Sequence, residues 1–372
     1  MSFSRADRSA VARWWWTVDR WTIAALVVLI GFGAVLSLAA SPAVAERIGY
    51  DSLHFAKRHI AMLPVAMAIM FLVSLQSPRV IRRIALIGFV LSVVALAATF
   101  VVGAEIKGAR RWINLPGMSL QPSEFVKPTF AVLAAWLIAE RKMKPQFPGY
   151  LIVGVLFALV LGMLIKQPDL GMTVVVAAVF FAQLFLAGLQ VYWVVVGVGL
   201  AGFGLIGAYT FLPHVTDRVN RFLDPASGDS YQVDRSLEAF MNGGLWGRGP
   251  GEGRVKEFLP DAHADFVFSV AGEEFGLIIC LAVVALFAFI VLRSFERLKQ
   301  DNNIFVILAA AGLFVQFGLQ AVINMASSLH LMPTKGMTLP FISYGGSSLL
   351  SLGLGMGMAL ALTRRRFGGT ET

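Results

Sequence analysis

The sequence has little of the charge with which a soluble protein covers its surface. Only 14% of its 372 residues are charged, against about 25% in a typical soluble domain, while 57% are hydrophobic and the mean hydropathy is +0.74. A water-soluble globule of this composition would expose large apolar patches, which soluble monomers avoid. The composition therefore excludes an ordinary cytosolic enzyme, a disordered chain and a collagen-like fibre. It indicates a polytopic membrane protein.

Two further features are missing: a set of cysteines and a basic patch of the kind that binds nucleic acid. The single Cys280 lies inside an apolar run, which excludes a disulfide framework and a cysteine-based zinc or iron–sulfur site. The net charge of +9 does not come from a Lys/Arg block interleaved with aromatic residues. In a membrane protein such an excess usually reports orientation, so we expect no nucleic-acid partner.

Long apolar runs are what the sequence has in abundance. A membrane helix needs about 20 mostly apolar residues. Ten such runs predict an all-α polytopic membrane protein with about ten transmembrane helices: 22–40, 59–75, 84–103, 124–139, 148–165, 170–188, 191–211, 266–292, 303–328 and 341–363. The chain then divides into an N-terminal tail, helices 1–7, a large loop, helices 8–10 and a C-terminal tail, at 1–21, 22–211, 212–265, 266–363 and 364–372.

The distribution of charge predicts the orientation of these helices. An even number of spans places both termini on one side, which carries 16 of the 31 basic residues but only six of the 22 acidic ones. By the positive-inside rule that side is cytoplasmic. The large loop between helices 7 and 8 is therefore expected to be extracytoplasmic.

This loop, residues 212–265, is too rich in Trp, Phe and Leu to be a simple linker. Within it, the apolar spacing of residues 234–245 predicts a helix lying at the membrane surface. The Gly-rich string at 247–253 follows no strand and opens no helix, so a nucleotide-binding loop is excluded. We expect a conformationally special loop there instead.

Charged residues at membrane depth are hypotheses of function by default. The strongest is Asp265, which stands where the large loop ends and an apolar run begins. A partly desolvated carboxylate there is suited to act as a general base near neutral pH. His263 has no second histidine at ligand spacing, so we expect a structural or interfacial histidine rather than a metal ligand. Glu273 and Glu274 lie deeper along the same predicted helix and are expected to be helix-packing partners.

A second group of charges surrounds the start of predicted helix 4. Glu124 and Lys127 are three residues apart and share a helix face. Two interpretations are open: an ion pair that docks the helix to its neighbour, or a polar lining for an anionic head group with Arg111 nearby as a phosphate donor. Lys335 is a further expected extracytoplasmic cation, beside a segment dense in small residues.

Several long motifs occur in order from the first predicted span to the last. They are GARRW, QPSEFVK, QPDLG, GGLWGRG, EFLPDAHADF, GEEFG and PTKGMTLPFISYGGSS. Together they resemble the SEDS family (shape, elongation, division and sporulation). The last motif and the loop spacing are closer to the division branch of that family than to its elongation branch.

The resemblance implies a peptidoglycan glycosyltransferase of the bacterial inner membrane. Such proteins polymerise lipid II outside the cytoplasm and release undecaprenyl pyrophosphate, here during septal cell-wall synthesis. They work with a class B penicillin-binding protein, which cross-links the product, and with other membrane proteins of the division complex. The resemblance places the catalytic aspartate at Asp265. It places sensitive charged positions, expected to bind substrate, at Arg111, Glu124, Lys127, Glu257 and Lys335.

The residues fit this chemistry, although Asp261 and Ala264 stand where many relatives have Glu and Thr. Inverting glycosyl transfer needs a base for the attacking hydroxyl and stabilisation of the charge on the leaving group. Asp265 is the candidate base. Arg111, Lys127 and Lys335 are candidates to stabilise pyrophosphate, with a divalent cation as a possible addition.

Two alternative functions stay open. A charged cavity among many helices could carry lipid II across the membrane, as a translocase does. A scaffold without enzymatic activity could recruit cell-wall enzymes through the large loop. Transporters place substrate at the bilayer midplane, whereas these charges cluster at the outer edge. That position favours chemistry on one face of the membrane.

Overall fold

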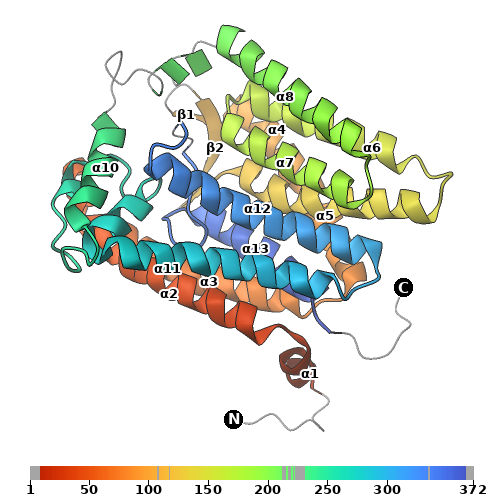
Figure 1. The fold of residues 1–372 in the computed structure, drawn as a ribbon, viewed down its shortest axis with the longest axis horizontal. Coiled ribbons are helices and arrows are strands. Elements are labelled where there is room, and N and C mark those ends of the chain that lie inside the picture. Colours follow the sequence, from red (N-terminus) through yellow and green to blue (C-terminus); the bar gives the residue numbers. More distant parts are fainter. Residues whose placement is uncertain are drawn as a thin grey trace.

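The structure is a computed structural model that describes residues 9–106, 109–116, 118–211, 215–216, 219–220, 222, 231–333 and 336–365. In this part of the chain a long helix corresponds to each of the ten predicted spans, with bounds shifted by a few residues (Figure 1). These helices are α2 (Arg20–Ala45), α3 (His54–Ser74), α4 (Pro78–Val102), α5 (Pro122–Met143), α6 (Gly149–Lys166), α7 (Leu170–Leu186), α8 (Val191–Phe211), α11 (Val267–Leu298), α12 (Ile304–Ser328) and α13 (Gly346–Leu362).

Most of these helices have the length and composition of membrane spans. Among the described residues, seven are long and apolar enough to cross a membrane: α2, α3, α4, α6, α8, α11 and α12. Helices α7 and α13 are apolar but have 17 residues each, and α5 carries Glu124 and Lys127 near its start. The predicted all-α membrane fold is confirmed.

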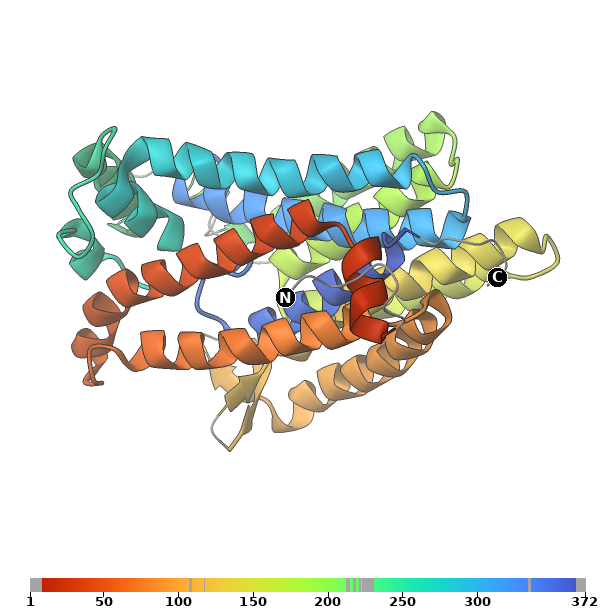
Figure 2. The same ribbon diagram turned by 90° about the horizontal axis from the view of Figure 1, so that it is seen from below.

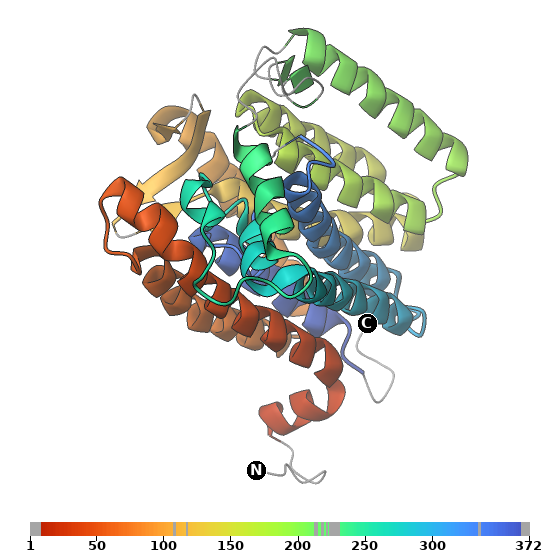
Figure 3. The same cartoon turned by 60° about the vertical axis from the view of Figure 1, so that its left-hand side comes forward.

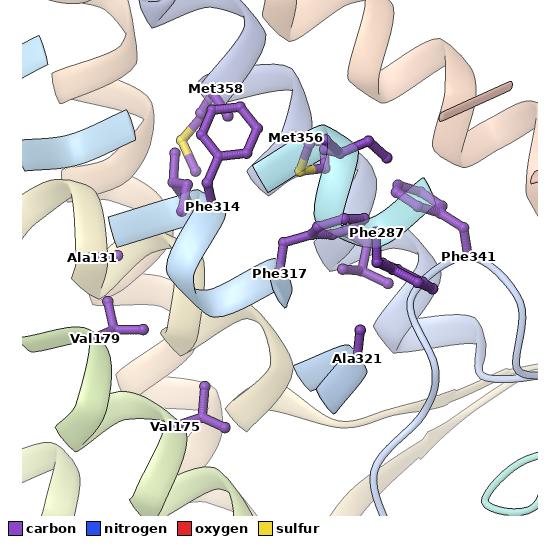
Figure 4. Packing of buried hydrophobic residues seen from close by; sticks show 14 of the residues in the cluster. Ala131, Val175, Val179, Phe287, Phe314, Phe317, Ala321, Phe341, Met356 and Met358 are labelled. Atoms are coloured by element: carbon purple, nitrogen blue, oxygen red, sulfur yellow. The ribbon is translucent and has the colours of Figure 1, made fainter. Parts of the chain in front are cut away.

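Helices α12 and α13 form the interior of the bundle (Figure 2). Side chains of α11, α12 and α13 meet there around Phe287, Phe317 and Met356, and α5 and α7 close the other side of α12 (Figure 4). Helix α8 lies at the edge of the bundle, next to α7 (Figure 3), and its most apolar stretch buries none of its described residues. Helices α12 and α13 therefore form the packed core, and α8 is exposed at the edge of the bundle.

Short elements cover the two ends of the bundle. Helix α1 (Ala10–Thr17) precedes α2 at one end, and α10 (Tyr231–Gly243) lies at the other, with the short helices η1 (Glu46–Ile48) and η3 (Val255–Phe258) (Figure 1). Helix α10 confirms the helix predicted in the large loop, and it packs on α11. The sequence did not predict the antiparallel sheet of β1 (Ala104–Ile106), β2 (Ala109–Leu115) and β3 (Met118–Leu120).

Helix α11 is broken near its start, at Gly276, whose φ of 78° and ψ of 178° are not helical. The Gly-rich loop completes the broken backbone, because residues 244–249 exchange four hydrogen bonds of 2.9–3.3 Å with residues 273–274 and 277–278 of the helix. A Cβ atom at Gly276 would lie only 2.4 Å from the backbone nitrogen of Gly247. The loop is thus built into the helix, as its expected special conformation requires.

Candidate functional site

A cavity of about 480 Å³ opens at the end of the bundle that carries α10. Its sides come from α3, from β2 and β3, from the start of α5, from the turn before α11, and from the segment that leads into α13. The polar and charged residues that line it include Arg58, His59, Glu124, His263, Asp265 and Tyr344. Elements far apart in the sequence thus converge on one cavity that has both polar and apolar walls.

Asp265 lies half-buried in the turn that precedes α11, as predicted. Asp261 begins this turn in a left-handed conformation (φ 54°), and its carbonyl accepts the N–H groups of Ala264 and Asp265, both at 3.0 Å. The carbonyls of residues 263–265 accept hydrogen bonds from the 339–344 segment and from α12. The backbone that carries the Asp265 carboxylate is therefore held from several sides.

Glu124 and Lys127 form a buried ion pair in the first turns of α5. Their charged atoms lie 2.9 Å apart, and the side chains are 6% and 1% exposed. Lys127 also donates to Oε1 of Gln320 at 2.9 Å. Glu124 lines the cavity and Lys127 does not. Lys127 therefore fits the interpretation as an ion pair that docks the helix. Glu124 fits this interpretation and also the interpretation as a lining for a head group.

The Arg111 side chain points to a neighbouring turn. From β2, its guanidinium donates to the carbonyls of Gln167 and Pro168, at 3.2 and 2.5 Å, and lies 3.9 Å from the carboxylate of Asp169. Arg111 is not among the residues that line the cavity. Arg111 and Glu124 therefore do not line the cavity together as expected, because the Arg111 guanidinium is bound to the QPDLG turn.

The remaining predicted site residues do not join Asp265 among the described cavity-lining residues. Glu257 lies in η3 with an exposed side chain. Lys335 lies outside the described residues. Its neighbour Gly336 lines the cavity with a φ of 61°, and a Cβ atom there would lie 3.5 Å from Oδ2 of Asp265. The segment before α13 therefore passes directly beside the Asp265 carboxylate.

Sequence reasoning missed the contribution of α3 to the cavity. Arg58 and His59 both line it, and neither ring nitrogen of the buried His59 has a hydrogen-bond partner within the described part of the chain. His263, which also lines the cavity, stacks on Phe55 of α3 with 4.2 Å between ring centroids, and burial lowers the pKa of His263 to about 4. The sequence signal for this contribution is the basic pair Lys57 and Arg58 at the start of the predicted span 59–75.

Glu273 and Glu274 anchor the large loop to α11. The Glu273 carboxylate accepts three backbone N–H groups from residues 254–256 at 2.8–3.0 Å, and Glu274 forms a buried ion pair with Lys256. The sequence predicts that both residues pack against neighbouring helices. In the structure they bind the large loop instead. Among the described residues, no three His, Cys, Asp or Glu side chains gather closely enough to hold a metal ion.

Comparison with known proteins adds independent evidence. Residues 20–367 match the FtsW/RodA/SpoVE family, described as cell cycle proteins. A protein of Caulobacter vibrioides named probable peptidoglycan glycosyltransferase FtsW is 46% identical over 370 residues, which cover 99% of this chain and 94% of that protein. A protein of Coxiella burnetii with the same name is 35% identical over 349 residues, which cover 90% and 93%.

Solved structures agree with this assignment. A structure from a peptidoglycan synthase complex that coordinates polymerization and crosslinking superposes with a TM-score of 0.74 at 26% identity, over 93% of this chain and 97% of that one. RodA of Thermus thermophilus superposes with a TM-score of 0.69 at 26% identity, over 94% and 97%. The SEDS resemblance carried by the motifs is confirmed: this multi-pass membrane protein belongs to the FtsW/RodA/SpoVE family of cell cycle proteins.

Proposed function

We propose that the protein is a peptidoglycan glycosyltransferase that polymerises lipid II during septal cell-wall synthesis. The observation that carries this proposal is the polar cavity with Asp265 on its surface, at the boundary between the large loop and α11. The names of the similar Caulobacter and Coxiella proteins support the same reaction. They also support the division branch over the elongation branch.

In the proposed reaction Asp265 is the general base. Its carboxylate takes the proton of an acceptor sugar hydroxyl while the hydroxyl oxygen forms a bond to the anomeric carbon of the donor. The bond from that carbon to the pyrophosphate breaks, and undecaprenyl pyrophosphate leaves with the electron pair. A base acts from about 2.6–3.2 Å, so Asp265 must be held close to the bound hydroxyl.

Binding of the substrate head group is the second part of the proposal. Arg58 and Glu124 line the cavity and are placed to contact the head group, and cations near the leaving group stabilise its developing charge. We propose Lys335 and Glu257 as further substrate-binding residues on the strength of the family motifs. For Lys127 and Arg111 we propose indirect roles, because Lys127 holds Glu124 and Arg111 holds the turn at 167–169.

The location and partners follow from the same reasoning. We propose that the end of the bundle with α10 and the cavity is extracytoplasmic, and that the termini are cytoplasmic at the division site. A class B penicillin-binding protein is the proposed principal partner, supported by the similarity to a structure from a peptidoglycan synthase complex. Other division proteins of the membrane are further expected partners.

Polymerisation of lipid II by purified full-length protein with its transpeptidase partner tests the proposal. The wild type should produce glycan strands, visible as a ladder after electrophoresis, and Asp265→Asn should produce none while remaining folded. Normal polymerisation by folded Asp265→Asn would refute the role of Asp265. Transfer of head groups across sealed vesicles without polymer would favour the translocase. Normal growth of cells that carry only Asp265→Asn would favour the scaffold.

A further inference from the structure

Helix α12 carries three buried amide side chains, spaced one turn apart, along one face: Gln316, Gln320 and Asn324. A buried amide in an apolar helix is unfavourable unless it is hydrogen-bonded. Gln320 and Asn324 make hydrogen bonds that leave the helix, whereas Oε1 of Gln316 has no partner within the described residues. The two amides nearer the cavity therefore differ from the third in what they contact.

The Asn324 amide joins two segments that meet at Asp265. Its Nδ2 donates to the backbone carbonyl of Asp265 at 2.9 Å and to the carbonyl of Met337 at 2.6 Å. An amide has two N–H donors, and both are used here. Its Oδ1 is buried without a partner among the described residues, which is unfavourable for stability. The Asn324 amide therefore fixes the two segments relative to each other.

The other bonds to the Asp265 turn come from a segment that is itself held by α12. Oγ of Ser343 donates to the carbonyl of Ala264 at 2.6 Å, and the N–H of Tyr344 donates to the carbonyl of His263 at 2.9 Å. The same segment is tied to α12 through Met337. Helix α12 therefore holds the turn both directly, at Asp265, and indirectly, through the segment that contains Met337.

Gln320 makes similar contacts next to the part of the cavity that contains Glu124. Its Oε1 accepts the hydrogen bond from Lys127, which holds Glu124. Its Nε2 donates to the carbonyl and to the hydroxyl of Thr338, at 3.1 and 3.2 Å. One face of α12 therefore connects the Glu124 side of the cavity to the Asp265 side, through residues that do not themselves line the cavity.

We propose that Asn324 is a positioning residue for Asp265, and that Gln320 sets the Glu124 side of the cavity against it. This inference rests on the proposed function, in which Asp265 must meet a sugar hydroxyl within hydrogen-bond distance. A displacement of about 1 Å in a reacting group can reduce the rate about 100-fold. Asn324 holds the Asp265 backbone against the Met337 segment, so its loss should change where the Asp265 carboxylate points.

Three variants of the full-length protein, assayed with its partner and lipid II, test this inference. Asn324→Leu removes both donors at similar volume, and Asn324→Asp keeps the shape but presents oxygen to the two carbonyls. Gln316→Leu is the matched control, since it removes a buried amide from the same helix face without touching the Asp265 turn. We expect Asn324→Leu to lower kcat about 10- to 100-fold with KM within about twofold of the wild type, and Gln316→Leu to change neither.

The pH dependence of Asn324→Asp separates positioning from packing. Protonation of the new carboxyl supplies one O–H donor to the two carbonyls, so the ratio of its kcat to the wild-type kcat should rise as the pH falls. A residue that only supports packing would give a ratio independent of pH. It would also lower the yield of folded protein without lowering kcat per folded molecule. Either result, or equal kcat values for Asn324→Leu and Gln316→Leu, would overturn the inference.

The failure of this inference is distinguishable from the failure of the proposed function. If the wild type makes no glycan strands, or Asp265→Asn makes them normally, the proposed function fails whatever Asn324 does. If Asp265→Asn is inactive while Asn324→Leu keeps the wild-type kcat and pH profile, only the positioning role fails.

Discussion

Loss of one partner from the Glu124–Lys127 ion pair should destabilise the protein strongly. The two side chains are almost fully buried and their charged atoms are 2.9 Å apart. Methionine at position 127 retains most of the volume of the lysine but leaves the Glu124 carboxylate without its cation. Removing one partner from a buried ion pair costs about 3–5 kcal/mol. We expect Lys127→Met to lower the free energy of unfolding by an amount in this range.

The double variant Glu124→Gln with Lys127→Met is the matched control, because it removes both charges and retains the shapes. Replacement of a whole buried pair by neutral side chains is often neutral or stabilising, so this variant should regain most of the lost stability. The assay is unfolding in mixed micelles with increasing SDS, followed by tryptophan fluorescence. A loss below about 1 kcal/mol for Lys127→Met, as expected of an exposed pair, would refute the reasoning. So would a double variant less stable than the single one.

Three other sites carry predictions of their own. Gly276→Ala should abolish accumulation of folded protein, measured by size-exclusion chromatography, because its Cβ atom would lie 2.4 Å from the backbone nitrogen of Gly247. Gly154→Ala is the control and should accumulate normally, since a Cβ atom there meets nothing within 4 Å. Burial lowers the pKa of His263 from its ordinary 6.5 to about 4, so the folded protein holds this ring neutral. The free energy of unfolding should therefore decrease as the pH falls from 6.5 towards 4, and His263→Gln should flatten this pH dependence. Burial alone would raise the pKa of Asp19, but hydrogen bonds from Arg293 lower it overall. Its contribution is therefore present above pH 3.8 and lost below, and Asp19→Asn should cost about 1–3 kcal/mol at neutral pH; an unchanged free energy of unfolding would contradict this.

The sequence was sufficient for features that depend on local composition. Each of the ten apolar runs corresponds to a helix because hydropathy and length alone favour a span. The position of Asp265 at a helix start also followed from the sequence, since the apolar run begins beside it. The spacing of Glu124 and Lys127 predicted their shared face, and the structure confirms it with an ion pair.

The sequence was insufficient where a partner lies far along the chain. Arg111 bonds to carbonyls more than 50 residues away, and no periodicity indicates such a contact. In the sequence Asn324 is one of several polar residues in an apolar run, and its role depends on the Asp265 turn 59 residues before it. The break at Gly276 was hidden inside a run that otherwise has the composition of one continuous helix.

The break in α11 joins the large loop to the helix through backbone hydrogen bonds. Four backbone groups of α11, on either side of Gly276, bond to residues 244–249 in place of the ordinary bonds along the helix. The loop therefore cannot move away without breaking these four bonds, and α10, which packs on α11, is tied to the same helix. Near its other end α11 carries Arg293 and Arg297, which form ion pairs with Asp19 at the start of α2. The two faces of the protein are thereby connected through a single helix.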